Sequence, residues 1–122
     1  MNELSILSIS AAGMDAQRGA LDIAARNVAA AQVAGPDGTF ERLVPRFAFA
    51  PLEADAPDGL PETGDELPAV RLTGVETMRG SEADAVTEMV AVLAAQRAYE
   101  ANASVFEAGK RLAERTIDVG RL

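Results

Sequence analysis

Proline is confined to the middle of this 122-residue chain. All six prolines lie between residues 36 and 68, whereas residues 3–34 and 82–119 contain none and hold ten alanines each. Alanine favours the interior of a helix more than any other residue, and proline disfavours it most. The distribution therefore predicts two long helices, one in each arm, separated by a segment that is not helical.

Helix-terminating residues refine these limits. The first arm ends at the sequence AGPDG, and the second begins at Ser81, a good N-cap with Asp84 as its partner three residues later. Gly120 is a typical C′ residue, just beyond the second helix. The sequence predicts a mainly α protein of one structural domain, in which two long terminal helices form a coiled-coil hairpin. Its parts are an N-terminal coiled-coil helix in 1–34, a Pro/Gly-rich connector in 35–80 and a C-terminal coiled-coil helix in 81–122.

The connector contains two stretches typical of β-strands, residues 39–49 and 69–75. Their partial alternation predicts a short β-hairpin, in which Pro45 restricts the first strand to a sheet edge. Residues 53–66 carry six acidic residues and no basic one. This composition predicts a solvated or disordered loop.

Apolar residues in the first arm recur at alternating intervals of three and four, and form two neighbouring rows. One row is Leu4, Leu7, Ala11, Met14, Arg18, Leu21, Ala25 and Val28, and the other is Ile6, Ile9, Gly13, Ala16, Ala20, Ile23, Asn27 and Ala30. A third row, which includes Ser8, Asp22 and Arg26, is mostly polar. A period of 3.5 residues is typical of a coiled coil, and two adjacent rows allow one helix to contact two neighbours.

The small side chains in these rows have an energetic consequence. Burial contributes about 0.8 kcal/mol per CH₂ group, whereas ordering the backbone of one residue costs about 1–2 kcal/mol. We therefore expect a single alanine-rich helical hairpin to be marginal as a monomer and to need other chains on both rows. An ordinary hairpin within one chain is the alternative.

The second arm also has two apolar faces. One consists of Val86, Val90, Leu93, Ala101, Val105, Ala108 and Leu112, and the other of Val92, Ala95, Tyr99, Phe106, Ala113 and Ile117. Arg97 interrupts the first face, and we expect it to pair with Glu100 or with an acid across an interface; a solvated charge is the alternative. Asn27 and Asn102 lie in apolar rows, where a buried asparagine fixes helix register, unless each faces a solvent groove.

The composition argues against several functions. A net charge of -8 argues against binding to nucleic acid. The absence of cysteine and histidine removes disulfides, thiolate chemistry, histidine catalysis and most transition-metal sites. The segment GPDG lacks the spacing of a phosphate-binding loop, and residues 53–66 lack the order of a calcium loop. We therefore expect no catalytic residue, cofactor or metal.

The sequence also predicts neither a membrane span nor a cleaved leader. No stretch approaches the roughly 20 apolar residues needed to span a bilayer, so membrane insertion is not expected. The apolar run near the N-terminus is broken by serines and has no basic residue before it. We therefore expect no cleaved signal peptide.

Both arms resemble a known family. The blocks GMDAQR and LDIAARN in the first arm are similar to the N-terminal helix of bacterial flagellar axial proteins, and RAYEAN in the second arm is similar to their matching C-terminal helix. Within that group, the short chain, the stretches DGTFERLVPRF and AVRLTGV and the ending ERTIDVGR most resemble the flagellar basal-body rod proteins.

The resemblance implies a structural protein and not an enzyme. It implies export through the flagellar export apparatus and assembly in the periplasm, with itself and other rod proteins, into the helical proximal rod that transmits torque from motor to hook. Two alternatives stay open: a soluble helical-hairpin binding module, such as an export chaperone or adaptor, and another flagellar axial or rod paralogue, such as rod protein B.

The residues expected to pack between subunits combine the two arms. They are Leu7, Gly13, Met14, Ala20, Leu21, Ile23, Asn27, Val28, Val86, Val90, Leu93, Arg97, Tyr99, Glu100, Asn102, Val105, Phe106 and Leu112.

Overall fold

The computed structural model describes residues 3–51, 68–81 and 84–121. The element order is α1 (Glu3–Gln32), β1 (Thr39–Pro51), β2 (Pro68–Ser81) and α2 (Asp84–Gly120). The described part is thus mainly helical, with an antiparallel two-stranded hairpin between two long helices, as predicted. The acidic loop expected at 53–66 lies outside the described residues.

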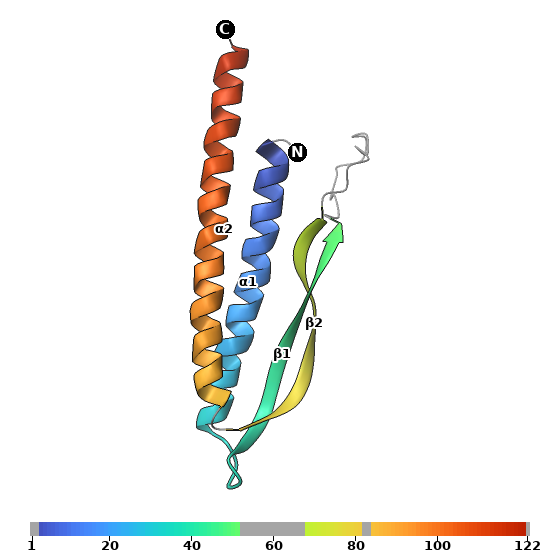
Figure 1. The fold of residues 1–122 in the computed structure, drawn as a ribbon, viewed down its shortest axis with the longest axis vertical. Coiled ribbons are helices and arrows are strands. Elements are labelled where there is room, and N and C mark those ends of the chain that lie inside the picture. Colours follow the sequence, from blue (N-terminus) through green and yellow to red (C-terminus); the bar gives the residue numbers. More distant parts are fainter. Residues whose placement is uncertain (1–2, 52–67, 82–83, 122) are drawn as a thin grey trace.

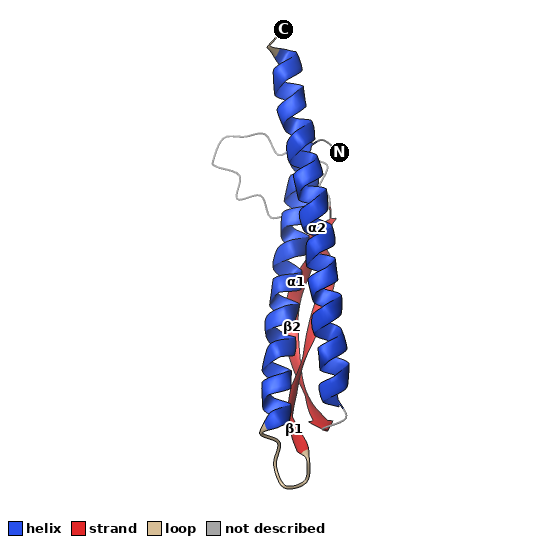
Figure 2. Cartoon of the chain, turned by 90° about the vertical axis from the view of Figure 1, so that its left-hand side faces the viewer, coloured by secondary structure: helices blue, strands red, loops and turns tan. Residues whose placement is uncertain are grey.

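The three layers of the molecule are α2, α1 and the β-hairpin, with α1 in the middle (Figure 1). α1 makes extensive contacts with α2 and with both strands, whereas the backbone of α2 comes close to the hairpin only slightly, at β2. Seen from the side of α2, the two helices run side by side in front of the hairpin (Figure 2). The coiled-coil character of the helix pair stays a prediction.

Local hydrogen bonds explain where the helices meet the strands. After α1 the chain turns at Gly38, which has a positive φ of 70° that glycine adopts readily. At the start of α2, the N–H of Ser81 donates to Asp84 Oδ2 over 2.7 Å, which confirms the predicted partnership of these two residues. Gly120 is the last residue of α2, so its predicted place just beyond the helix is wrong by one residue.

The hairpin is confirmed, but its strands extend over residues 39–51 and 68–81 and are longer than predicted. Antiparallel pairing runs from Thr39 opposite Ser81 to Pro51 opposite Pro68, with one irregularity between Arg46 and Phe47. Because of this pairing, the sheet includes polar residues of β2. The sequence pattern alone did not predict these residues as strand. Pro45 is tolerated because each strand of a two-stranded sheet is an edge.

The hydrophobic core of the described residues is small. Four of its six buried apolar side chains are alanines. The six are Ala16, Ile23, Ala24, Phe40, Ala69 and Ala95. Such a core leaves little apolar area per ordered residue, which is the situation expected of a marginally stable monomer.

Candidate subunit-packing surface

α1 and α2 approach each other closely where glycines face side chains. A methyl group at Gly13 would lie 2.7 Å from Oδ1 of Asn102, and one at Gly109 would lie 3.1 Å from Cγ2 of Ile6. The absence of a side chain at Gly13 and Gly109 thus makes room for side chains of the opposite helix. Glycine at these two positions therefore allows side chains of the opposite helix to lie against the helix backbone.

The side of α2 that faces α1 is formed by residues that recur at alternating intervals of three and four. We call this set the inner seam. All of its members are buried or half-buried, and they are Val92, Ala95, Tyr99, Asn102, Phe106, Gly109 and Ala113. The apolar face predicted from the second arm is thus covered by the chain itself as far as Ala113, whereas its last predicted member, Ile117, is 57% exposed.

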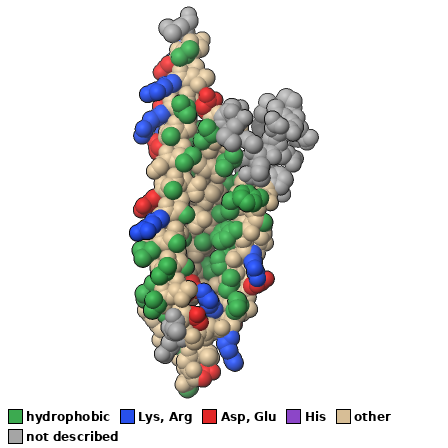
Figure 3. Space-filling view, viewed as in Figure 1, with side chains coloured by type: hydrophobic (Ala, Val, Ile, Leu, Met, Phe, Trp, Pro, Cys, Tyr) green, Lys and Arg blue, Asp and Glu red, His purple; other side chains and the backbone are tan. Residues whose placement is uncertain are grey.

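The other apolar face of α2 is exposed. We call it the outer seam. Its large side chains retain between 46% and 66% of their full exposure, and they are Val86, Val90, Leu93, Val105 and Leu112. Hydrophobic side chains on α2 are visible from the front, interspersed with charged ones along its outer edge (Figure 3). The described part of the chain leaves the outer seam largely uncovered.

A groove between α1 and α2 contains two hollows. The charged hollow, of about 290 Å³, is lined by Arg18, Leu21, Gln96, Tyr99 and Glu100. The apolar hollow, of about 480 Å³, is lined by Ala25, Val28, Met89, Val92 and Leu93.

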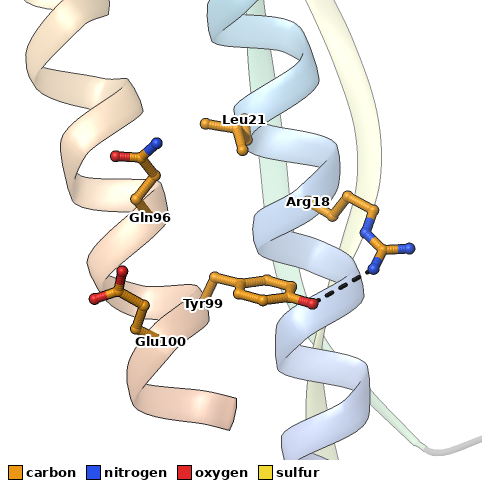
Figure 4. A pocket seen from close by; sticks show the side chains of 5 residues that line it. All are labelled: Arg18, Leu21, Gln96, Tyr99 and Glu100. Carbon is orange, nitrogen blue, oxygen red and sulfur yellow. Dashed lines mark hydrogen bonds between the residues drawn. The ribbon is translucent and has the colours of Figure 1, made fainter.

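In the charged hollow, Tyr99 extends from α2 toward α1, and its hydroxyl accepts a hydrogen bond of 3.4 Å from Nη2 of Arg18 (Figure 4). Most of the groove is open to solvent and can receive a further side chain.

Asn27 anchors the hairpin to α1. Its Nδ2 donates to the carbonyl of Leu43 over 2.7 Å, and its Oδ1 accepts from the N–H of Leu43 over 2.8 Å. The Asn27 side chain is almost completely buried, at 1% exposure. This asparagine therefore fixes a helix against a strand, whereas the sequence pattern suggested register between helices or a solvent groove.

A second anchor joins β1 to α2 and was not identified from the sequence. Arg42 Nε donates to Glu88 Oε1 over 2.5 Å, and the side chain of Glu88 is only 5% exposed. Arg42 Nη1 also lies 4.0 Å from Asp84. Glu88 lies seven residues before Ala95, in line with the inner seam, and that spacing is the one signal in the sequence that pointed to its burial.

The predicted packing residues divide between the two surfaces. Those buried or half-buried within the chain are Leu7, Gly13, Met14, Ala20, Leu21, Ile23, Asn27, Val28, Tyr99, Asn102 and Phe106. Those exposed on α2 are Val86, Val90, Leu93, Arg97, Glu100, Val105 and Leu112. Within the described chain Arg97 and Glu100 are not within ion-pair distance of each other, so pairing across an interface and a solvated charge both stay open for Arg97.

None of the described helices is both long and apolar enough to cross a membrane. The same part of the chain holds no group of three or more acidic side chains placed to bind a metal ion.

The sequence of the chain is similar to those of known proteins. Residues 76–119, which cover the end of β2 and nearly all of α2, match the family described as "Flagellar basal body rod FlgEFG protein C-terminal". The chain is also 34% identical over 138 residues to the flagellar basal-body rod protein FlgC of Aquifex aeolicus (strain VF5), and the match covers 97% of each chain. The chain belongs to the flagellar basal-body rod protein family and is a structural subunit of the rod, not an enzyme.

Proposed function

We propose that this rod subunit belongs to the proximal rod, where it assembles helically with copies of itself and with other rod proteins and transmits torque from the motor to the hook. The observation that supports this proposal is the exposed outer seam of α2. The similarity to FlgC over 97% of both chains favours this family position over that of rod protein B.

Assembly supplies the stabilisation that the monomer lacks. Complete burial of a valine or leucine side chain contributes about 1.5–3 kcal/mol, and the five side chains of the outer seam are each about half exposed. Their burial by other subunits would therefore contribute several kcal/mol, which is comparable to the total stability of a small domain, about 5–15 kcal/mol. We infer that α2 becomes firmly structured on assembly.

The same balance suits secretion. A chain with four alanines among its six core side chains unfolds at low cost. We propose that the subunit passes through the flagellar export apparatus in an unfolded or nearly unfolded state and becomes stable in the rod. An export chaperone or adaptor, the other candidate, would need a stable fold of its own, and the comparisons do not favour it.

Complementation of a strain that lacks the gene tests the proposal. The wild-type gene should restore rods and motility. Val90→Asp on the outer seam and Leu21→Asp in the groove should restore export but not rods, because each places a charge on an apolar packing surface. Ser8→Asp is the matched control, since Ser8 is exposed and lies in the polar row of α1.

The proposed function and the assignment of the two surfaces are contradicted by different results. Rods that assemble without the gene would contradict the proposed function. Normal motility with both Val90→Asp and Leu21→Asp would contradict the assignment of these surfaces to assembly.

A further inference from the structure

We propose that the groove between α1 and α2 receives the outer seam of α2 from a second copy of this chain. The two α2 helices would run parallel and at the same height, with Val90 of one copy in the apolar hollow of the other and Arg97 beside Glu100 in the charged hollow. This inference rests on the proposed rod function and specifies one contact within it.

The two hollows are copies of each other, one heptad apart. On α1, Ala25 and Val28 of the apolar hollow lie seven residues after their counterparts in the charged hollow, Arg18 and Leu21. On α2 the counterparts lie seven residues earlier: Gln96, Tyr99 and Glu100 correspond to Met89, Val92 and Leu93. The opposite direction is required because the helices are antiparallel. The groove thus offers holes at a repeat of about 10.5 Å along the helix.

A helix that fills both holes needs two exposed side chains seven residues apart. Val90 and Arg97 have this spacing and lie on the exposed side of α2. Passing along α2 from its start, the apolar hollow comes first and the charged hollow second, and Val90 likewise precedes Arg97. The order of side chains therefore matches the order of holes when the two α2 helices are parallel.

Charges along α2 support the same register. Glu100 lines the groove, and Glu107 and Glu114 follow at intervals of seven, which places them on the same side of the helix. Arg97, Arg111 and Arg115 share the face of the outer seam, since 14 and 18 residues are close to whole numbers of turns.

None of these six charges is paired within the described chain, whose ion pairs are Asp22–Arg26, Arg42–Asp84, Arg42–Glu88 and Arg46–Glu76.

In the parallel register, the face of α2 that carries Arg97, Arg111 and Arg115 in one copy meets the edge of α2 in the next copy. That edge carries Glu100, Glu107 and Glu114. Arg97 and Glu100 are then about one turn apart in height, and so are Arg111 and Glu114. Exposed pairs of this kind contribute little energy, so burial of the outer seam provides the affinity and the charges select the register and the partner. Because the groove and the outer seam share only Leu93, the contact is heterologous and repeats into a ring or a helical array.

Cross-linking between two tagged versions of the full chain tests the contact directly, because the chain has no native cysteine. One version carries Val90→Cys and the other Ala25→Cys, and both are expressed in the strain that lacks the gene. We expect a disulfide-linked heterodimer in assembled rods. The matched control replaces Ala25→Cys by Arg26→Cys, about 100° around α1, and should give no heterodimer.

Charge reversal then tests the register. Arg97→Glu on the Val90→Cys version, or Glu100→Arg on the Ala25→Cys version, should each lower the yield of heterodimer about tenfold, because an attraction becomes a repulsion. Both changes together, one on each version, should restore the yield. Within each version residues 97 and 100 then still carry like charges, so the rescue cannot come from a pair inside one helix.

Three outcomes would overturn the inference: no heterodimer in assembled rods, no rescue by the double reversal, or a cross-link from Val90→Cys only to a different rod protein. All three leave the proposed rod function intact. That function fails separately, if rods assemble in the strain without the gene.

Discussion

The side chain of Asn102 in α2 lies against Gly13 in α1, and a methyl group on residue 13 would be 2.7 Å from Oδ1 of Asn102. Gly13→Ala therefore brings two opposing effects: a gain in helix propensity of about 1 kcal/mol and a steric clash that costs about 1–3 kcal/mol. We predict that Gly13→Ala lowers the free energy of unfolding, measured by urea titration in sucrose, which favours the compact state.

The double variant separates the two effects. In an Asn102→Ala background the clash is removed, so Gly13→Ala should then raise stability by up to about 1 kcal/mol. A destabilisation of equal size in both backgrounds would show that Asn102 is not the neighbour that limits residue 13.

Asn27→Leu should release the hairpin from α1. The substitution preserves the approximate size of the side chain but leaves the N–H and carbonyl of Leu43 without the partners they have at 2.8 and 2.7 Å. We predict that the substitution lowers the free energy of unfolding by about 2–4 kcal/mol and makes amide exchange at Leu43 faster. Thr73→Val is the control, because it removes only an exposed hydrogen bond to Arg46 O in the same hairpin and should cost less than about 1 kcal/mol. Equal losses in the two variants would contradict the anchoring role.

Two arginines on β1 provide a matched comparison of ion pairs. Arg42 pairs with the buried Glu88, whereas Arg46 pairs with the exposed Glu76. Arg42→Ala should lower the free energy of unfolding several times more than Arg46→Ala does, because it leaves a buried carboxylate unpaired. Urea titration of both variants checks this, and Arg42→Ala combined with Glu88→Gln should recover part of the loss. Similar costs for the two single variants would contradict it.

The start of α2 should weaken in acid. The backbone N–H of Ser81 donates to Asp84 and, with the Ser81 hydroxyl and nearby Arg42, holds the pKa of Asp84 below its usual value. A carboxylate with a lowered pKa in the folded state stabilises the fold above the usual aspartate pKa, about 3.9. That contribution is lost as the pH falls below this value. We predict that the protection of the Ser81 amide, its exchange rate compared with that of an unfolded peptide at the same pH, falls below about pH 4 in the wild type, and that Asp84→Asn shows the low protection throughout. A wild-type protection that does not change with acid would exclude this role.

Much of the architecture follows from local sequence chemistry. The proline-free, alanine-rich arms predicted both helices, and the Ser81–Asp84 pair predicted the start of the second. The length of the strands did not follow, because residues 76–80 of β2 lack an alternating apolar pattern. They are in the sheet because the antiparallel register places them opposite residues 40–44.

The packing surfaces could be predicted only in part. The rows of period 3.5 identified which faces of α2 are apolar, but a row does not reveal whether its neighbour belongs to the same chain. The structure places the inner seam against α1 and leaves Val86 and Val90 exposed. Arg42 and Glu88 escaped detection because they are 46 residues apart, and their contact depends on how the hairpin folds back along the helices.

The dependence of the fold on neighbouring subunits is tested most directly by thermal unfolding of the dilute, monomeric chain, followed by far-ultraviolet circular dichroism. With a small core and an uncovered outer seam, we predict partial helicity and a broad transition of low cooperativity. A sharp two-state transition at high temperature, with the full helix content of α1 and α2 in the isolated monomer, would contradict this central claim.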